Sequence, residues 1–268
     1  MRQFILEKEP DKAGLITVIG KDFRYLRQVL RVKVGDMINV RIPSGALKNS
    51  TVVSIEENAK KIVLQICADT NGEKEKSITR GVQADEIQMQ NEKEYWLFQF
   101  IPKPQKFEQI VRQATECGIK RIVPVIGEYS EKNSINALKN SKQERLERII
   151  KEARQQSGSP VDTVVNECVT LEQAVELWNS MDVVKDEKIA FVLSERDEGS
   201  NDVRKVIEDK EKITKIGIVV GSEGGISPAE VEFMLEKADF KPIHFSVNIL
   251  RCETAALYGI AAIQTAVN

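Results

Sequence analysis

The amino-acid sequence predicts an α/β protein in which a small β-barrel precedes a parallel β-sheet covered by helices on both faces. Two observations support this fold class. Residues 1–68 contain short runs of β-branched residues separated by turn signals, with one helical stretch at 21–31, which is typical of a small barrel. From Tyr95 onward, strands that are apolar throughout alternate with helical segments. Such strands are typical of parallel sheets that are buried on both faces.

The N-terminal strands are expected where β-branched residues cluster. They are predicted at 15–19, 37–42, 51–55 and 61–66. Residues 69–94 are polar with scattered apolar residues, and we predict a linker with an exposed loop or hairpin there. A domain boundary is expected in this stretch, which would divide the chain into domains 1–72 and 73–268.

The second part of the chain alternates strands and helices. Strands are predicted at 95–101, 121–126, 163–166, 189–193, 216–220 and 242–247. Helices are predicted after Pro104, at 142–156, near 171–181, from Pro228, and at 253–266. After Pro104, apolar residues at helical spacing form one face of the predicted helix. Ser227 precedes Pro228 and is the expected N-cap of the helix that follows.

The composition is that of a globular protein. Of 268 residues, 41% are hydrophobic and 30% are charged, so the chain is too apolar to be disordered. The longest apolar stretch, 255–263, is far shorter than the roughly 20 residues of a membrane-spanning helix. The first ten residues contain no apolar run of the kind found in signal peptides. We therefore expect a cytosolic protein.

Cysteine and histidine usage restricts the possible chemistry. The cysteines at positions 67, 117, 168 and 252 lie far apart and form no CxxC pair. We therefore expect reduced thiols, with neither a disulfide framework nor a metal site. His244 is the single histidine and lies in an apolar run, where a structural role is expected. Nucleophilic catalysis by a Ser-His or Cys-His pair would have to use it and is disfavoured.

Charge is distributed unevenly along the chain. Residues 1–72 carry 12 Lys and Arg against 8 Asp and Glu, whereas residues 73–268 carry 27 against 33. A basic domain beside an acidic one would suit nucleic-acid binding by the first. A difference of this size is equally consistent with chance.

Two basic segments are candidates for RNA contacts. Residues 21–33 hold five basic residues together with Phe23 and Tyr25, a combination that suits phosphates and unpaired bases. A second basic cluster surrounds the helix predicted after Pro104. The candidate RNA-binding residues are Arg24, Arg27, Arg31, Lys33, Lys103, Lys106 and Arg112. For each of them, a solvated helix face is the alternative interpretation.

A glycine-rich segment is the most informative feature. A buried strand runs into Gly221-Ser222-Glu223-Gly224-Gly225, and parallel sheets bind ligands at the carboxyl ends of their strands. The spacing is neither GxGxxG nor GxxxxGK[ST], so the usual dinucleotide and phosphate loops are absent. A tight strand–helix turn explains one or two glycines but not a carboxylate held among three. The segment therefore favours ligand binding.

A second segment follows the last predicted strand. Asn248-Ile249-Leu250-Arg251 leads into a helix with Glu253 in its first turn. An acidic residue there also suits the helix dipole. The alternative interpretation is therefore that Glu253 is a cap and Arg251 a solvated loop residue.

Taken together, these segments resemble the RsmE family over nearly the whole chain. The matching motifs are Val29-Leu30-Arg31 with Gly35-Asp36, the stretch from Lys103 to Gly118 with Ala114-Thr115-Glu116, Glu152-Ala153-Arg154-Gln155-Gln156-Ser157, the GSEGG loop at 221–225, and Ile249-Leu250-Arg251-Cys252-Glu253-Thr254-Ala255. The chain departs from the family pattern at several positions. Ser222 replaces the loop proline, Phe23-Arg24-Tyr25 lacks a histidine, and Val247-Asn248 replaces a leucine-glycine pair.

The resemblance implies an N-terminal PUA-like barrel and a C-terminal SPOUT domain whose last elements form a trefoil knot. It also implies a homodimer that binds S-adenosylmethionine in the knot and makes N3-methyluridine in 16S rRNA of the small ribosomal subunit. The alternatives are a SPOUT-like RNA-binding or ribosome-assembly protein without catalysis, a methyltransferase for a different RNA, and an α/β enzyme that acts on a free nucleotide.

The chemistry assigns roles to the residues of these segments. Uracil N3 must lose a proton before it can attack a methyl group. Arg251 is the candidate that stabilises the resulting negative charge, and Glu223 or Glu253 the candidate proton acceptor. The cofactor is expected to contact the strand end at Leu193, Ser194 and Glu195, the loop residues Gly221, Ser222, Glu223, Gly224 and Gly225, and Asn248, Ile249 and Leu250.

Overall fold

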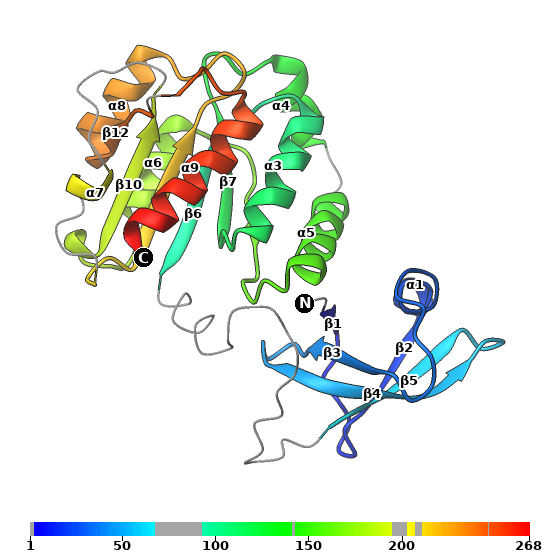
Figure 1. Cartoon of the computed structure of the whole chain (residues 1–268). Coiled ribbons are helices and arrows are strands. Elements are labelled where there is room, and N and C mark those ends of the chain that lie inside the picture. The colour runs from blue at the N-terminus through cyan, green and yellow to red at the C-terminus, as the bar shows by residue number, and fades with distance from the viewer. Residues whose placement is uncertain (1–2, 68–92, 141–142, 195–202, 207–210, 246) are drawn as a thin grey trace. The chain divides into compact units, whose positions relative to one another are not determined.

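The computed structural model describes all residues except 1–2, 68–92, 141–142, 195–202, 207–210 and 246 (Figure 1). The chain divides into two compact units, Met1–Gly81 with Gln155–Gly158, and Val82–Arg154 with Ser159–Asn268. The boundary expected from composition, and the linker with its loop or hairpin, fall almost entirely on residues outside the described part.

The small unit contains a five-stranded sheet in the order β1-β3-β4-β5-β2. Its strands are β1 (Phe4–Ile5), β2 (Leu15–Ile19), β3 (Met37–Arg41), β4 (Leu47–Glu56) and β5 (Lys61–Ile66). Strands β1 and β3 pair in parallel, and the other pairs are antiparallel. The four strands expected here are therefore confirmed, although β4 is longer than predicted. β1 was not foreseen because two residues carry no periodic signal.

One helical segment follows β2. Helix α1 (Gly20–Arg24) continues as a single π-helical turn, η1 (Tyr25–Val29). The prediction of a helix to residue 31 was two residues too long, because Arg31 has a positive φ of 56°. Phe23 and Leu26 bury their side chains in the core of this unit beside Phe4, Val52 and other apolar residues.

The large unit is built on a parallel sheet in the order β12-β10-β11-β6-β7-β8, with β9 also paired to β7. Its strands are β6 (Glu94–Phe100), β7 (Arg121–Ile126), β8 (Val164–Val165), β9 (Val169–Thr170), β10 (Lys188–Leu193), β11 (Lys215–Val220) and β12 (Lys241–Ile243). Every pairing is parallel. The α/β class with a parallel sheet is therefore confirmed.

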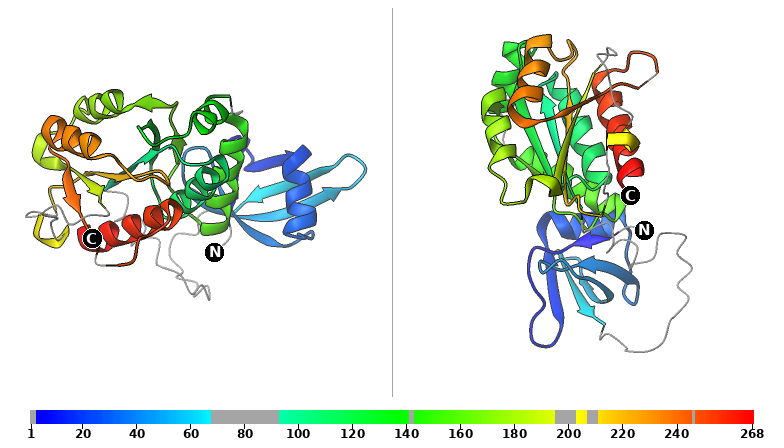
Figure 2. Two further views of the ribbon diagram at one scale, coloured as in Figure 1. Left: turned by 90° about the horizontal axis from the view of Figure 1, so that it is seen from above. Right: turned by 90° about the vertical axis from the view of Figure 1, so that its left-hand side faces the viewer.

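Helices cover both faces of this sheet (Figures 1 and 2). One apolar cluster joins the sheet to α3 (Pro104–Glu116), α5 (Gln143–Ser157), α7 (Val203–Val206) and α9 (Cys252–Val267). The other joins the opposite face to α6 (Leu171–Asn179) and α8 (Pro228–Ala238). Helix α4 (Lys132–Lys139) and the 3₁₀ turn η3 (Lys185–Glu187) complete the described elements. Of these, α4, α7 and η3 were not predicted.

The last predicted strand was wrong in its second half. Strand β12 ends at Ile243 rather than at residue 247. Its partner β10 ends at Leu193, and the N–H of Ser194 makes the last bond, to Ile243 O at 2.9 Å. Among the described residues, no strand lies beside those that follow Ile243, and the chain leaves the sheet there. Residues 244–245 and 247–251 then form part of a cavity.

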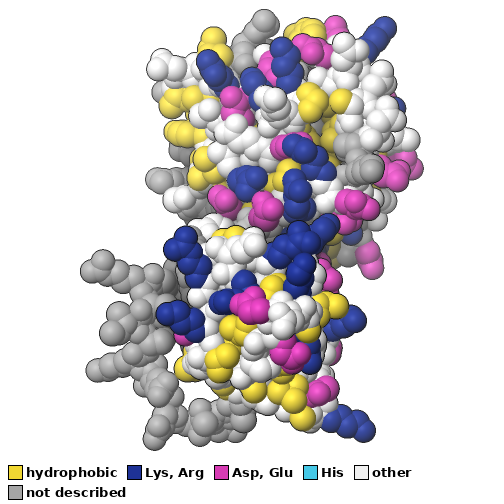
Figure 3. Space-filling view, turned by 90° about the vertical axis from the view of Figure 1, so that its right-hand side faces the viewer, with side chains coloured by type: hydrophobic (Ala, Val, Ile, Leu, Met, Phe, Trp, Pro, Cys, Tyr) yellow, Lys and Arg dark blue, Asp and Glu magenta, His cyan; other side chains and the backbone are white. Residues whose placement is uncertain are grey.

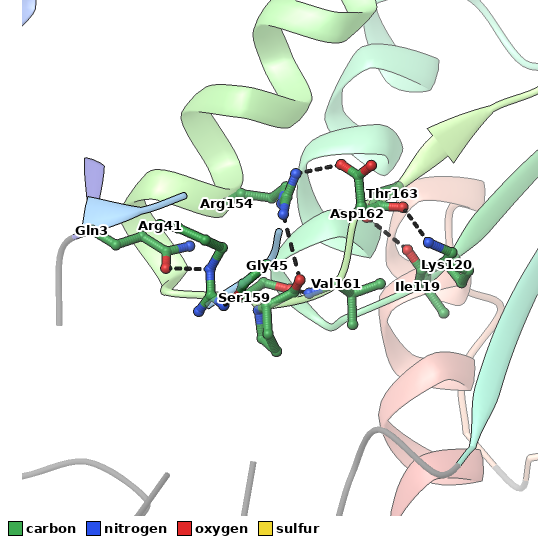
Figure 4. A network of polar contacts seen from close by, with 11 residues as sticks. Gln3, Arg41, Gly45, Ile119, Lys120, Arg154, Ser159, Val161, Asp162 and Thr163 are labelled. Atoms are coloured by element: carbon green, nitrogen blue, oxygen red, sulfur yellow. Dashed lines mark hydrogen bonds and ion pairs between the residues drawn. The ribbon is translucent and has the colours of Figure 1, made fainter. Parts of the chain in front are cut away.

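Polar contacts are also buried within each unit (Figure 4). In the small unit, Arg41 is buried and donates from Nε to Gln3 Oε1 at 2.8 Å and from a terminal nitrogen to Gly45 O at 2.6 Å. In the large unit, Thr163 Oγ1 donates to Ile119 O at 2.7 Å and thereby ties the chain before β8 to the chain before β7. These contacts satisfy buried groups, and we assign them a structural role.

Candidate active site

The glycine-rich loop makes a tight turn between β11 and α8. Gly225 N–H donates to Ser222 O at 3.0 Å, and Gly225 has a φ of 78°. A Cβ atom on Gly221 would lie 2.7 Å from the carbonyl carbon of Gly225, and one on Gly224 would lie 2.7 Å from Tyr129 Cβ. The turn and its packing therefore account for all three glycines, and the expectation that a tight turn explains only one or two of them was wrong. Ser227 caps α8 in a capping box with Glu230, as predicted.

A cavity of about 530 Å³ lies at the carboxyl ends of β10, β11 and β12. Of the residues predicted to contact a cofactor, those that the structure describes all line it, Glu223 among them. The predicted catalytic Arg251 also lines it, whereas Glu253 is not among the lining residues. Glu195 lies outside the described residues. A volume of this size is within the usual range for a small-molecule site.

The sequence analysis did not identify several residues that line the cavity. Tyr129 and Phe245 contribute aromatic surface, and His244 adds an imidazole. His244 Nδ1 lies 3.1 Å from Ser194 O. Because a carbonyl oxygen can only accept, Nδ1 carries the proton and Nε2 of the neutral ring is an acceptor. His244 and Phe245 were assigned to the last predicted strand, and Tyr129 lies far from the other cavity residues in the sequence.

Gln99 is another residue that sequence reasoning missed. Its side chain is fully buried in β6, and Nε2 donates to Gly221 O at 3.0 Å and to Val220 O at 3.3 Å. These bonds hold the end of β11 where the glycine-rich loop begins. A glutamine within the apolar strand YWLFQF was the available signal, because a buried amide needs partners.

One hydroxyl in the loop has no partner. Ser222 is buried, and its Oγ makes no hydrogen bond with any described residue. An unpaired buried hydroxyl is costly, and Ser222 lines the cavity. A bound molecule with a polar group at this position would satisfy it.

Three charged side chains meet at one edge of the cavity. Lys106 Nζ lies 3.5 Å from Glu223 Oε1 and 3.3 Å from Glu253 Oε2. The backbone N–H of Lys103 also donates to Glu223 Oε1 at 3.2 Å. Desolvation lowers the pKa of Lys106, but the Glu253 and Glu223 carboxylates raise it by more. The structure thus brings both predicted acids together, with a lysine between them.

The first turn of α9 completes this group. Burial and the adjacent Glu253 raise the pKa of the Cys252 thiol to about 12, so it stays protonated. Its Sγ donates to Glu253 Oε2 at 3.3 Å. Burial alone would raise the pKa of Glu253 as well, but the backbone N–H, Cys252 and Lys106 lower it by more. Glu253 is therefore an anion near neutral pH.

Arg251 occupies the N-cap position of α9, with φ −66° and ψ 151°. Its carbonyl accepts from Thr254 and Ala255 N–H at 2.8 and 2.7 Å. The side chain is exposed and lines the cavity. A cation here can reach a negatively charged substrate atom.

The candidate RNA-binding residues differ in their surroundings. In the small unit, Arg24, Arg31 and Lys33 are exposed, and Figure 3 shows basic side chains interspersed with hydrophobic ones on its surface. Arg27 instead donates to Glu57 Oε1 at 2.8 Å and to Val32 O at 2.6 Å. Its guanidinium therefore helps to hold the small unit together.

In the large unit, the candidates lie on α3 or at its N-cap. Lys103 Nζ lies 3.6 Å from Glu131, and Arg112 lies 4.0 Å from Glu152, both at the surface. Such exposed pairs contribute little and are readily exchanged for a phosphate. Lys106 differs, because it is paired with Glu223 of the cavity wall and with Glu253 beside it.

No helix among the described residues is long and apolar enough to cross a membrane. In the same part of the chain, no three His, Cys, Asp or Glu side chains are grouped so that they could hold a metal ion.

The chain is similar to known ribosomal RNA methyltransferases. The "Ribosomal RNA small subunit methyltransferase E 2" of Borreliella burgdorferi is 27% identical over 263 residues, 97% of this chain and 96% of that protein. The "Ribosomal RNA small subunit methyltransferase E" of Rickettsia conorii is 27% identical over 164 residues, and the match spans 61% of each chain.

The fold has a solved counterpart. The crystal structure of a ribosomal RNA small subunit methyltransferase E from Neisseria gonorrhoeae bound to S-adenosyl methionine matches with a TM-score of 0.73 at 22% identity, covering 99% of this chain and 97% of that one. Residues 89–264 match the RNA methyltransferase domain family. Because this match spans well over half of the chain, the protein belongs to that family.

Proposed function

We propose that this protein transfers a methyl group from S-adenosylmethionine to N3 of a uridine in 16S rRNA of the small ribosomal subunit. The observation that carries the proposal is the cavity in which the glycine-rich loop and the 248–251 segment meet at three strand ends. The names of the two relatives support ribosomal RNA of the small subunit as the substrate. The N3 position rests on the resemblance to the RsmE family.

The cavity residues fit the proposed cofactor. The unpaired Ser222 hydroxyl and the acceptor nitrogen of His244 provide polar groups, and Leu193 and Phe245 provide apolar surface for an adenosyl group. S-adenosylmethionine supplies an activated methyl group on a positively charged sulfur. The Glu223 and Glu253 carboxylates give the nearby wall a negative charge, which favours such a cation.

The chain's own residues would prepare uracil N3 for attack. Arg251 stabilises the negative charge that spreads to the uracil oxygens when N3 loses its proton. Of the two carboxylates, Glu223 is the better acceptor, since its side chain is 31% exposed against 12% for Glu253. The lowered pKa of Glu253 also makes it a weak base.

The RNA would be held by the basic residues outside the cavity. We assign phosphate contacts to Arg24, Arg31, Lys33, Lys103 and Arg112, and a supporting role to Arg27. The N-terminal domain, residues 1–72, would then be a PUA-like barrel that binds RNA, and residues 73–268 a SPOUT methyltransferase domain with a C-terminal trefoil knot. The order of strands in the two sheets is compatible with this assignment.

A second copy of the chain would complete the site. Ile249 is 82% exposed although it lines the cavity, and Val247, Leu257 and Tyr258 are also exposed. Large apolar side chains gathered near a ligand cavity are typical of interaction surfaces. We propose that a homodimer covers them.

The experiment that tests the function is methyl transfer from labelled S-adenosylmethionine to small ribosomal subunits from a strain that lacks this modification. The modified nucleoside is identified by mass, and subunits that already carry the modification serve as the control. We expect N3-methyluridine in the first substrate and no transfer to the second. Cofactor binding without transfer to any RNA would instead support an RNA-binding or assembly protein.

A further inference from the structure

We infer that Lys106 is a positioning residue of the proposed methyl-transfer site and not a phosphate contact. It would join the glycine-rich loop to the first turn of α9 by pairing with Glu223 and Glu253. This inference rests on the proposed function, because it assigns a role within the same site.

The location of Lys106 requires an explanation. It lies in the first turn of α3, which begins at Pro104, where the helix dipole disfavours a positive charge. The two carboxylates, 3.5 and 3.3 Å away, reverse that preference. Glu223 also accepts from the Lys103 N–H. The start of α3 is therefore built to hold the Glu223 carboxylate.

The same contacts argue against a role in RNA binding. The two carboxylates carry more negative charge than the Lys106 ammonium carries positive charge. An RNA phosphate that approached Lys106 would therefore be repelled by Glu223 and Glu253. The Lys106 side chain is 28% exposed. Lys103, three residues earlier, is 59% exposed and has a single acidic partner at the surface. Lys103 is free to exchange that partner for a phosphate.

The pairing has a structural consequence for the cavity. Glu223 lies in the loop after β11, and Glu253 follows the proposed charge-stabilising Arg251 by two residues. Without the lysine, two carboxylates would face each other with no positive charge between them. The loop and the start of α9 would then separate. Both the cofactor surface and Arg251 would be displaced.

Two lysine variants separate the alternatives. For Lys106→Met we expect about tenfold weaker binding of S-adenosylmethionine by calorimetry, because both acids lose their charged partner. The salt dependence of 16S rRNA binding should stay as in the unmodified protein. Lys106→Arg should recover most of the cofactor affinity. The matched variant Lys103→Met should leave cofactor affinity unchanged and reduce the slope of log K against log salt by about 0.7 to 0.9.

A double-mutant cycle tests the Lys106–Glu253 pairing through thermal stability, independently of cofactor binding. We expect Glu253→Gln and Lys106→Met to lower the melting temperature by less in combination than the sum of their separate effects, because they remove one shared contact. Additive effects would show that the pairing contributes nothing. Cofactor affinity unchanged in Lys106→Met, with a reduced salt slope, would also overturn the inference.

The same measurements distinguish this inference from the proposed function. Suppose that Lys106→Met binds S-adenosylmethionine more weakly but the unmodified protein methylates no ribosomal RNA. The positioning role of Lys106 would then stand, and the proposed substrate would be wrong. If the unmodified protein bound no S-adenosylmethionine, the proposed function would fail. The melting-temperature cycle, measured without cofactor, would still decide whether Lys106 joins the two segments.

Discussion

At the scale of single residues, Glu253 links stability to pH. The backbone N–H, Cys252 and Lys106 lower its pKa below the ordinary 4.5. A carboxyl group with a lowered folded-state pKa stabilises the fold above its unfolded pKa, and this contribution is lost as pH falls through the folded value. We expect Glu253→Gln to lower the melting temperature by about 2 to 4 °C at pH 7. The difference should shrink below about pH 4.5, and a constant difference down to pH 3 would contradict the assignment.

Arg251 is the residue whose proposed role is chemical. Its side chain is exposed at the cavity, and a charge that acts only as the substrate ionises affects turnover more than binding. We expect Arg251→Ala to reduce turnover on rRNA about 100-fold while leaving the affinity for S-adenosylmethionine within about twofold. Single-turnover assays and calorimetry measure the two quantities. An equal loss of both would contradict a role in charge stabilisation.

Some functional residues could be predicted from the sequence and others could not. The motifs identified Glu223, Arg251 and the glycines because each lies in a short, unusual segment. They assigned Lys106 to RNA because helical periodicity cannot show that acids from two distant segments meet at its side chain. Gln99 and His244 were missed for the same reason. Their roles arise from contacts of Gln99 with Gly221 and of His244 with Ser194, across long sequence separations.

At the scale of elements, the apolar strands were the strongest signal, and the predicted order of strands and helices was correct across the large unit. The end of β12 was not predictable, because His244, Phe245 and Val247 are as apolar or β-prone as strand residues. In the described part of the chain, the pairing of β12 with β10 ends at Ile243 and Leu193. Short elements such as β9 and α7 were missed because they contain too few residues for a periodic pattern.

The packing of α9 on β10 gives a prediction for these elements. A Cβ on Gly259 would lie 2.4 Å from Leu193 Cδ2, and Leu193 lines the cavity. Alanine normally favours a helix over glycine by about 1 kcal/mol, but the clash should outweigh this gain. We expect Gly259→Ala to lower the melting temperature and weaken cofactor binding. The double variant Gly259→Ala/Leu193→Ala should recover part of the melting temperature, and a stabilised single variant would contradict this packing.

At the scale of the whole molecule, the exposed apolar residues at the cavity predict the assembly. A charge at Ile249 would be buried without a partner in a dimer that covers this surface, at a cost of several kcal/mol. We therefore expect Ile249→Glu to sediment as a monomer and to bind S-adenosylmethionine more weakly. Val184 is the matched control, because it is 63% exposed in the same unit and does not line the cavity. Val184→Glu should remain dimeric at the same concentration. If Ile249→Glu sediments with the dimer mass of the unmodified protein, the dimer interface lies elsewhere. If the unmodified protein is itself monomeric at all concentrations, the cavity functions without a partner.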